Sequence, residues 1–107
     1  MDNPVIYQIK DNETALKCLE NELETGPDQK NARFILRYPT VYIHNLKGSD
    51  HYEVYIGESN NIIQRTMQHY ETAKQDDTWQ HRFVQDENAR LFIIGHDHFN
   101  KTLTLDV

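Results

Sequence analysis

Two β-prone segments separated by a short turn are the feature that most constrains how this chain can fold. The first segment is Thr40 to Leu46 (TVYIHNL) and the second is Tyr52 to Gly57 (YEVYIG). The intervening Lys47-Gly48-Ser49-Asp50 has the composition of a turn, because glycine, serine and aspartate favour tight reversals of the backbone. The two segments are therefore predicted to pair as an antiparallel hairpin.

A helix is predicted to follow the hairpin directly. Ser59 or Asn60 is expected to cap it, because a side-chain oxygen there can accept hydrogen bonds from the N–H groups of the first turn. The helix is expected to run to about Lys74. Its apolar residues recur at helical spacing, and those predicted to face the core are Ile63, Met67 and Tyr70.

Residues 1–39 are predicted to form an N-terminal extension. Val5 to Ile9 (VIYQI) has the composition of a short strand. Asp11 or Asn12 is expected to cap a helix that ends before Gly26-Pro27, since proline bars continuation. The apolar stripe of this helix is Leu16, Leu19 and Leu23. Asp28 to Ala32 is predicted to be a polar loop.

The remaining segments complete an α+β pattern. Arg33 to Leu46 is interpreted as a strand interrupted by a proline, Trp79 to Gln85 as a short helix, and Arg90 to Gly95 as a further strand. Another helix is expected to open at Thr102 or Thr104. We therefore predict a small, mainly antiparallel three-stranded sheet flanked by helices.

Composition excludes several classes of protein. The 107 residues fit one domain. The apolar runs, such as Leu91 to Ile94, are far shorter than the roughly 20 residues of a membrane-spanning helix, and no secretory signal is visible. The single cysteine, Cys18, cannot form an internal disulfide. We therefore expect a protein of the reducing cytoplasm.

The charge balance is acidic, with 11 lysines and arginines against 17 aspartates and glutamates and a net charge of −6. Proteins that bind the phosphate backbone tightly on their own are usually basic. The composition therefore argues against tight DNA binding by this domain alone. It is compatible with a catalytic domain that a DNA-binding partner delivers.

The segment from Tyr55 to His69 (YIGESNNIIQRTMQH) carries a specific pattern. A strand ends in Tyr-Ile-Gly, a small hydroxyl residue stands at Ser59, and the following helix carries Arg65 and His69 one turn apart. This pattern resembles the core signature of the GIY-YIG endonuclease superfamily. The family's first half, Gly-Ile-Tyr on the preceding strand, is similar to Thr40-Val41-Tyr42, with threonine in place of glycine.

The resemblance covers residues 40–107 and implies a metal-dependent DNA endonuclease domain that hydrolyses phosphodiesters, within a larger DNA-processing protein. Tyr55 or Tyr42 would position or deprotonate the attacking water. Arg65 would stabilise the charge of the transition state, and His69 would hold a phosphate oxygen or assist proton transfer. Geometry agrees, because tyrosines on neighbouring strands can direct both hydroxyls at one water if they point to the same face, and residues four apart share one side of a helix.

Three further positions are expected to shape the site rather than to react. Gly57 should let the chain turn tightly from strand to helix, and Ser59 and Asn61 belong to the same motif. Glu58 lies among them. A solvated carboxylate favoured by the helix dipole is the preferred interpretation of Glu58.

The family binds one divalent cation, usually magnesium, through a glutamate near the start of the helix after the third strand. That region here is Lys101–Val107, where no glutamate occurs and Asp106 is the nearest carboxylate. The segment Phe99–Val107 (FNKTLTLDV) is similar to bacterial proteins that join a GIY-YIG domain to a P-loop ATPase or helicase-like region. The similarity implies that the glutamate follows Val107, so that residues 1–107 should fold but cut DNA poorly.

Other interpretations stay open. A degenerate GIY-YIG domain that only binds DNA or protein would explain the acidic charge and the missing glutamate, whereas the four polar motif residues favour catalysis. His96 and His98 could suggest a metal site, but surface histidines are favoured because structural zinc usually has four ligands. Trp79 with His81 and Arg82 could contact a nucleic acid, but packing of Trp79 in the core is favoured.

Overall fold

A computed structural model describes residues 3–99 of the chain. Within this range there are four strands and four helices. In chain order they are β1 (Val5–Lys10), α1 (Glu13–Thr25), α2 (Gln29–Leu36), β2 (Thr40–Lys47), β3 (Tyr52–Ser59), α3 (Ile62–Thr72), α4 (Trp79–Gln85) and β4 (Arg90–Gly95). The predicted bounds of α4 and β4 are confirmed. The helix expected at Thr102 or Thr104 lies outside the described residues.

The strands form one antiparallel sheet in the order β1-β4-β2-β3. The predicted α+β class and the antiparallel pairing are confirmed, but the prediction of a three-stranded sheet is wrong. The additional strand is β1, which pairs with β4 from Val5 opposite Gly95 to Lys10 opposite Arg90. Residues 1–39 thus contribute an edge strand to the sheet that also contains the β2–β3 hairpin.

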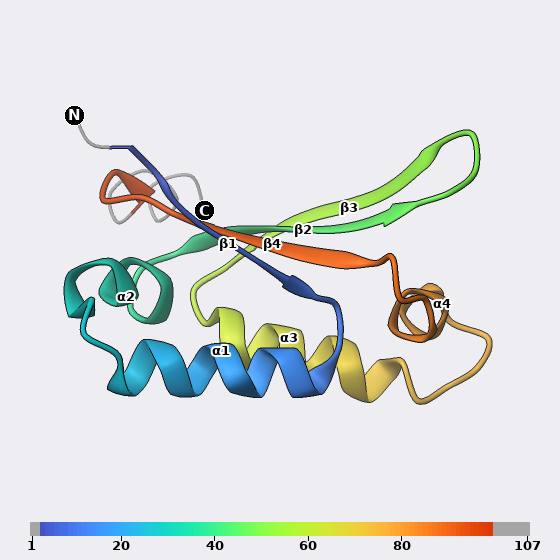
Figure 1. The fold of residues 1–107 in the computed structure, drawn as a ribbon, viewed down its shortest axis with the longest axis horizontal. Coiled ribbons are helices and arrows are strands. Elements are labelled where there is room, and N and C mark those ends of the chain that lie inside the picture. The colour runs from blue at the N-terminus through green and yellow to red at the C-terminus, as the bar shows by residue number, and fades with distance from the viewer. Residues whose placement is uncertain (1–2, 100–107) are drawn as a thin grey trace.

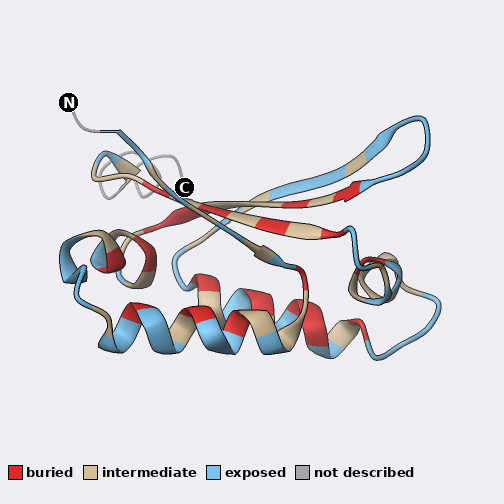
Figure 2. Ribbon diagram, in the orientation of Figure 1, coloured by how far each residue is buried: buried red, intermediate tan, exposed pale blue. Residues whose placement is uncertain are grey.

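The helices lie on one side of the sheet, and Figure 1 shows α1 and α3 side by side beneath it. In Figure 2 the buried residues of the helices face the sheet. The main core cluster contains Leu19, Leu23, Ala32, Ile35, Ile62, Leu91 and Ile93. The other face of the sheet carries exposed apolar side chains, including Ile6 and Ile56. The sheet is therefore covered on its helical face, where its polar side chains can meet those of α3.

The helix starts are set by side-chain caps. Asn12 caps α1, accepting a hydrogen bond from the Ala15 N–H at 2.8 Å, which is one of the two caps predicted. The predicted stripe of α1 is confirmed as buried. The cap of α3 is Asn61 rather than Ser59 or Asn60.

The predicted loop from Asp28 to Ala32 is wrong, because α2 begins there. Asp28 caps this helix by accepting from the Asn31 N–H at 3.2 Å, and Ala32 and Ile35 are buried one turn apart. The prediction of a strand from residue 33 to residue 38 is also wrong, because α2 continues to Leu36. The helical spacing of two buried residues outweighs the local polar composition.

No helix within residues 3–99 combines the length and the apolar character needed to cross a membrane.

Leu19→Ala should lower the free energy of unfolding by about 3 kcal/mol, because it leaves a cavity in a cluster shared with Leu91 and Ile93 of β4. Urea denaturation would measure this. Cys18→Ala, on the exposed side of the same helix, is the matched control and should change stability by less than about 0.5 kcal/mol. Equal effects of the two substitutions would mean that α1 does not share the core of the sheet.

Candidate functional site

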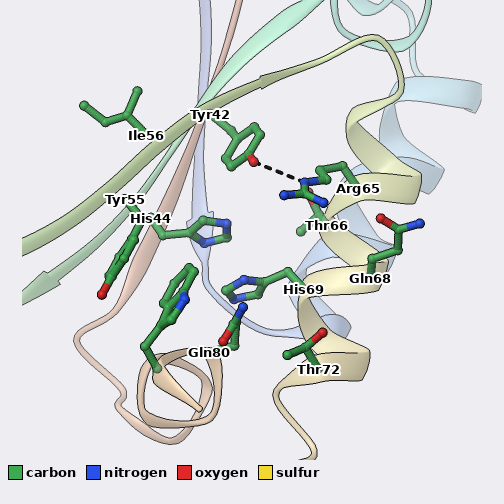
Figure 3. Close-up of a pocket in the computed structure, with 11 residues that line it drawn as sticks. Tyr42, His44, Tyr55, Ile56, Arg65, Thr66, Gln68, His69, Thr72 and Gln80 are labelled. Carbon is green, nitrogen blue, oxygen red and sulfur yellow. Dashed lines mark hydrogen bonds between the residues drawn. The ribbon is translucent and has the colours of Figure 1, made fainter.

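A cavity of about 260 Å³ opens between the sheet, α3 and α4 (Figure 3). Its wall is polar and aromatic, with side chains from β2, β3, α3 and α4. All the residues predicted to be catalytic line it, namely Tyr42, Tyr55, Arg65 and His69. The strand, strand, helix order of the motif therefore brings these side chains to one place.

Tyr42 enters the cavity from β2 and makes a direct contact with α3. Its hydroxyl accepts a hydrogen bond from the Arg65 Nε at 3.2 Å (Figure 3). In the hairpin register Tyr42 lies opposite Gly57 of β3. The tyrosine and the arginine therefore form one polar unit on the cavity wall.

Gly57 makes room for the Tyr42 ring. The expectation that Gly57 turns the chain from strand to helix is wrong, because it lies inside β3 and no described glycine has a positive φ. A Cβ at this position would lie 2.5 Å from the Tyr42 Cζ, far inside van der Waals contact. The missing side chain thus lets the ring lie across β3.

Ser59 and Asn61 build the turn from β3 into α3. The Ser59 Oγ accepts a hydrogen bond from the Asn61 N–H at 3.0 Å. The Asn61 side chain in turn accepts one from the Gln64 N–H at 3.2 Å. These bonds determine where α3 begins, and so they place Arg65 one turn later beside Tyr42.

Tyr55 lines the same cavity, but its ring contacts α4. It stacks on Trp79 with centroids 3.7 Å apart and an interplanar angle of 10°, and Phe83 meets it edge-on at 5.6 Å. Figure 3 shows its hydroxyl directed away from Tyr42 and Arg65. The expectation that both tyrosine hydroxyls converge on one water is therefore wrong, because stacking on α4 turns Tyr55 aside.

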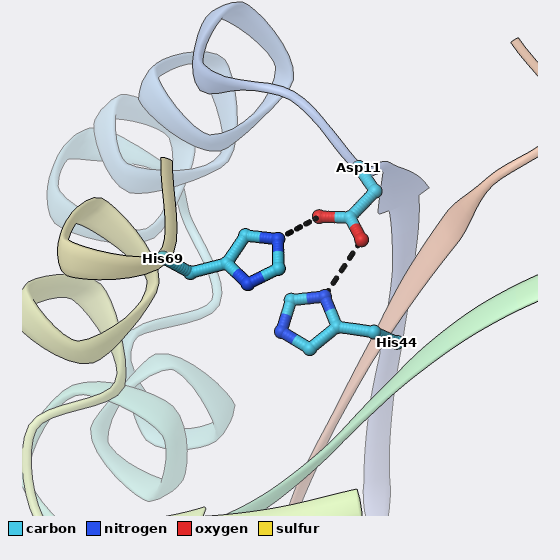
Figure 4. Close-up of side chains that lie close together, drawn as sticks. All are labelled: Asp11, His44 and His69. Carbon is cyan, nitrogen blue, oxygen red and sulfur yellow. Dashed lines mark hydrogen bonds and ion pairs between the residues drawn. The ribbon is translucent and has the colours of Figure 1, made fainter. Parts of the chain in front are cut away.

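Behind the cavity, the buried Asp11 carboxylate is hydrogen-bonded to two side chains and lies near a third. Its Oδ2 accepts a hydrogen bond from the His44 Nδ1 at 2.6 Å and its Oδ1 accepts one from the Tyr70 hydroxyl at 2.9 Å. The His69 Nε2 lies 3.8 Å from Oδ1 (Figure 4), which is too far for a hydrogen bond. The rings of His44 and His69 stack with centroids 4.0 Å apart.

Burial has the largest influence on the ionisation of His69. It lowers the pKa of the imidazole to about 4, with His44 and Arg65 lowering it further and the Asp11 carboxylate opposing them. His69 is therefore neutral at pH 7. Its Nε2 is buried with no hydrogen-bond partner among the described residues, so Nδ1 is the ring nitrogen left to face the cavity.

The sequence patterns do not predict Asp11 or His44 as site residues. His44 carries a weak indication, because it follows Tyr42 by two positions and so shares its face of β2. Asp11 carries none, since its local sequence is typical of a helix cap. Its partners His44 and Tyr70 are 33 and 59 positions away in the chain.

The described residues offer two groups that could hold a cation. The donor atoms of Asp11, His44 and His69 all lie within 4.8 Å of one another, as do those of the consecutive residues 96–98. The latter form a local turn in which the His98 N–H donates to the His96 Nδ1. The described residues that line the cavity include no carboxylate, and Asp106 lies outside the described range.

Comparison of the chain with protein-family models, with curated proteins and with solved structures found no match.

Gly57→Ala should lower the free energy of unfolding by about 1–3 kcal/mol, because the added methyl group displaces the Tyr42 ring. In a Tyr42→Ala background the same substitution should be close to neutral. Urea unfolding of the wild type, both single variants and the double variant measures this coupling. An equal loss of unfolding free energy in the two backgrounds would show that Gly57 is not needed to make room for the Tyr42 ring.

The low pKa of His69 predicts a loss of stability in weak acid. The unfolded chain takes up a proton near pH 6.5 and the folded chain only near pH 4, so stability falls as the pH drops between these values. Between pH 7 and pH 5 the wild type should lose about 2 kcal/mol more than His69→Gln. Asp11, His44, Arg65 and Tyr70 are common to both proteins.

Urea unfolding at the two pH values, with a chelator present, measures the difference. The same pH dependence in both proteins would show that His69 is not the group that titrates.

Proposed function

We propose that this cavity is the phosphodiester-binding site of a DNA endonuclease domain. The observation that carries the proposal is the hydrogen bond between the Arg65 Nε and the Tyr42 hydroxyl at 3.2 Å in a cavity also lined by His69. A guanidinium, a phenol and an imidazole in one solvent-open cavity suit a substrate whose oxygens gain negative charge during reaction.

Arg65 has the main electrostatic role in this proposal. Its Nε donates to Tyr42, and its terminal nitrogens make no hydrogen bond to the described residues. They can therefore donate in parallel to two non-bridging phosphate oxygens. The Tyr42 oxygen, already fixed by Arg65, can accept a further hydrogen bond and so orient the attacking water.

His69 is proposed to hold a phosphate oxygen through Nδ1. Its pKa of about 4 makes it a weak base at neutral pH, because efficient proton transfer needs a pKa near the working pH. Hydrogen bonding to the phosphate is therefore favoured over proton transfer. None of the contacts assigned to Tyr42, Arg65 and His69 is made through a metal ion.

The magnesium ion that the GIY-YIG resemblance calls for does not fit the described residues of the cavity wall. Magnesium relies on one or two carboxylates, and the described lining residues provide none. We therefore propose that a carboxylate from residues after β4, beyond the described range, completes the site. Asp106 is the candidate within the sequence.

The acidic charge of the chain bears on how the domain would meet DNA. A net charge of −6 opposes association with a polyanion. We propose that the domain acts within a larger DNA-processing protein, in which a P-loop ATPase or helicase-like region brings DNA to the cavity.

A second candidate function is a degenerate domain that binds DNA or protein without cutting. The net charge of −6 and the lack of a carboxylate among the described residues that line the cavity favour it. Retained DNA binding with no magnesium-dependent cleavage by the full-length protein would support the second function over the first.

Arg65→Ala in the full-length protein should lower DNA cleavage by about 100-fold or more, the scale of losing one donor to a developing charge. Its side chain is exposed, so stability should barely change. Magnesium-dependent nicking of supercoiled plasmid measures the effect, with the exposed Arg37→Ala as control. Wild-type cleavage by Arg65→Ala would rule out the proposed role.

A further inference from the structure

We propose that Asp11, His44 and His69 form a binding site for a transition-metal dication of the zinc class. The donors come from separate parts of the fold, with Asp11 between β1 and α1, His44 on β2 and His69 on α3 (Figure 4). This site adjoins the cavity, because His44 and His69 also line the cavity wall. It is distinct from the magnesium ion required by the proposed endonuclease, and it does not depend on that function.

The donor set has the right chemistry for such an ion. Two imidazoles and one carboxylate are characteristic ligands of zinc and its neighbours, whereas magnesium prefers oxygen ligands in an octahedron. The three residues are 2%, 2% and 9% exposed, so the set is buried rather than a chance grouping of surface charges.

The distances between donor atoms leave room for the ion after small adjustments. Tetrahedral bonds of about 2.0–2.1 Å place neighbouring ligand atoms roughly 3.3 Å apart. Here the Asp11 Oδ2 lies 2.6 Å from the His44 Nδ1, and the Asp11 Oδ1 lies 3.8 Å from the His69 Nε2. The required spacing falls between these values, so rotation of the carboxylate brings both pairs toward it. The rings of His44 and His69 are stacked with an interplanar angle of 12°. Because the lone pair of an imidazole nitrogen lies in the ring plane, one ring must also tilt out of the stack to bind the same ion.

Hydrogen bonding around Asp11 does not explain why the His69 Nε2 is buried without a partner. Asp11 is satisfied without a metal, because it accepts from both His44 and Tyr70. The His69 Nε2 is directed at the same carboxylate, yet it is buried and has no hydrogen-bond partner among the described residues. Buried polar atoms of native proteins are nearly always paired, and a bound cation would pair this one.

The surroundings already orient the carboxylate of the ligand set and restrict the two rings. The Tyr70 hydroxyl donates to the Asp11 Oδ1 at 2.9 Å, which orients the carboxylate as outer partners of metal ligands commonly do. The His44 ring lies between the stacked ring of His69 and the edge of Trp79, with centroids 4.0 and 5.8 Å away. The carboxylate is thus oriented before any ion binds, whereas one imidazole ring has to tilt when the ion enters.

Cobalt(II) added to metal-free protein tests the site without any mutation. One equivalent of Co²⁺ should bind and give the intense visible absorption of tetrahedral nitrogen and oxygen ligation, and Zn²⁺ should displace it. NMR of the imidazole nitrogens should show changes at the His44 Nδ1 and the His69 Nε2. Absence of binding, or changes confined to other histidines, would overturn the proposal.

Substitutions test the ligands one by one through Zn²⁺ affinity. Tyr70→Phe keeps every ligand but removes the outer hydrogen bond, and should weaken Zn²⁺ binding about 10- to 100-fold. His69→Gln removes a ligand and should weaken it more. His51→Gln changes an exposed histidine and should leave the affinity unchanged. Wild-type affinity of His69→Gln would overturn the proposal.

The histidines after β4 are the competing source of metal binding. A His96→Gln, His98→Gln double variant should retain the equivalent of bound Zn²⁺. Loss of binding in this double variant, with binding retained in His69→Gln, would assign the metal to residues 96–98 and overturn the proposal. If His69→Gln fails to fold, Tyr70→Phe and the wild-type NMR shifts decide the question.

Discussion

The buried carboxylate of Asp11 is the interaction on which the rest of this structure depends. Removing a carboxylate from water costs roughly several kcal/mol unless close hydrogen bonds replace its hydration. Here His44 and Tyr70 supply those bonds at 2.6 and 2.9 Å. They come from β2 and α3, so the carboxylate is satisfied only when the β1–α1 junction, an inner strand and the helix have all assembled. Residues 1–39 are thereby tied to the hairpin by a specific polar contact as well as by apolar packing.

The cavity exists because α3 buries a different face from the one its apolar residues predict. The expected buried side was Ile63, Met67 and Tyr70, whereas the buried residues are Ile62, Thr66, His69 and Tyr70. Ile63 and Met67 are only partly buried. The rotation puts two polar side chains under the sheet, where the Asp11 network and the aromatic wall of Trp79 accommodate them. Space that longer apolar side chains would fill is instead left as a polar cavity beside Arg65.

The sequence predicts those parts of the molecule whose causes are local. The alternation of apolar and polar residues and the composition of the turn are enough to predict the pairing of β2 and β3. The spacing of the motif is enough to predict that Tyr42 and Arg65 share one site. What it does not predict depends on distant contacts. The place of β1 at the sheet edge is decided by its pairing with β4, and the stacking of Tyr55 depends on Trp79 of α4. Asp11 has the local sequence of a helix cap, so nothing nearby reveals its contacts with His44 and Tyr70.

The proposed dication would also resolve an electrostatic conflict between Asp11 and an anionic substrate. A buried carboxylate close behind the cavity repels phosphate, and the low pKa of His69 means that this imidazole carries no positive charge to offset it at neutral pH. A dication held by Asp11, His44 and His69 would reverse the sign of the local charge and add to the attraction of Arg65. It would also fix the Nε2 of His69, and the contact made by one ring nitrogen sets the direction of the other. The buried site would therefore act on the cavity in two ways, by making its field favourable to phosphate and by directing the His69 Nδ1 toward it.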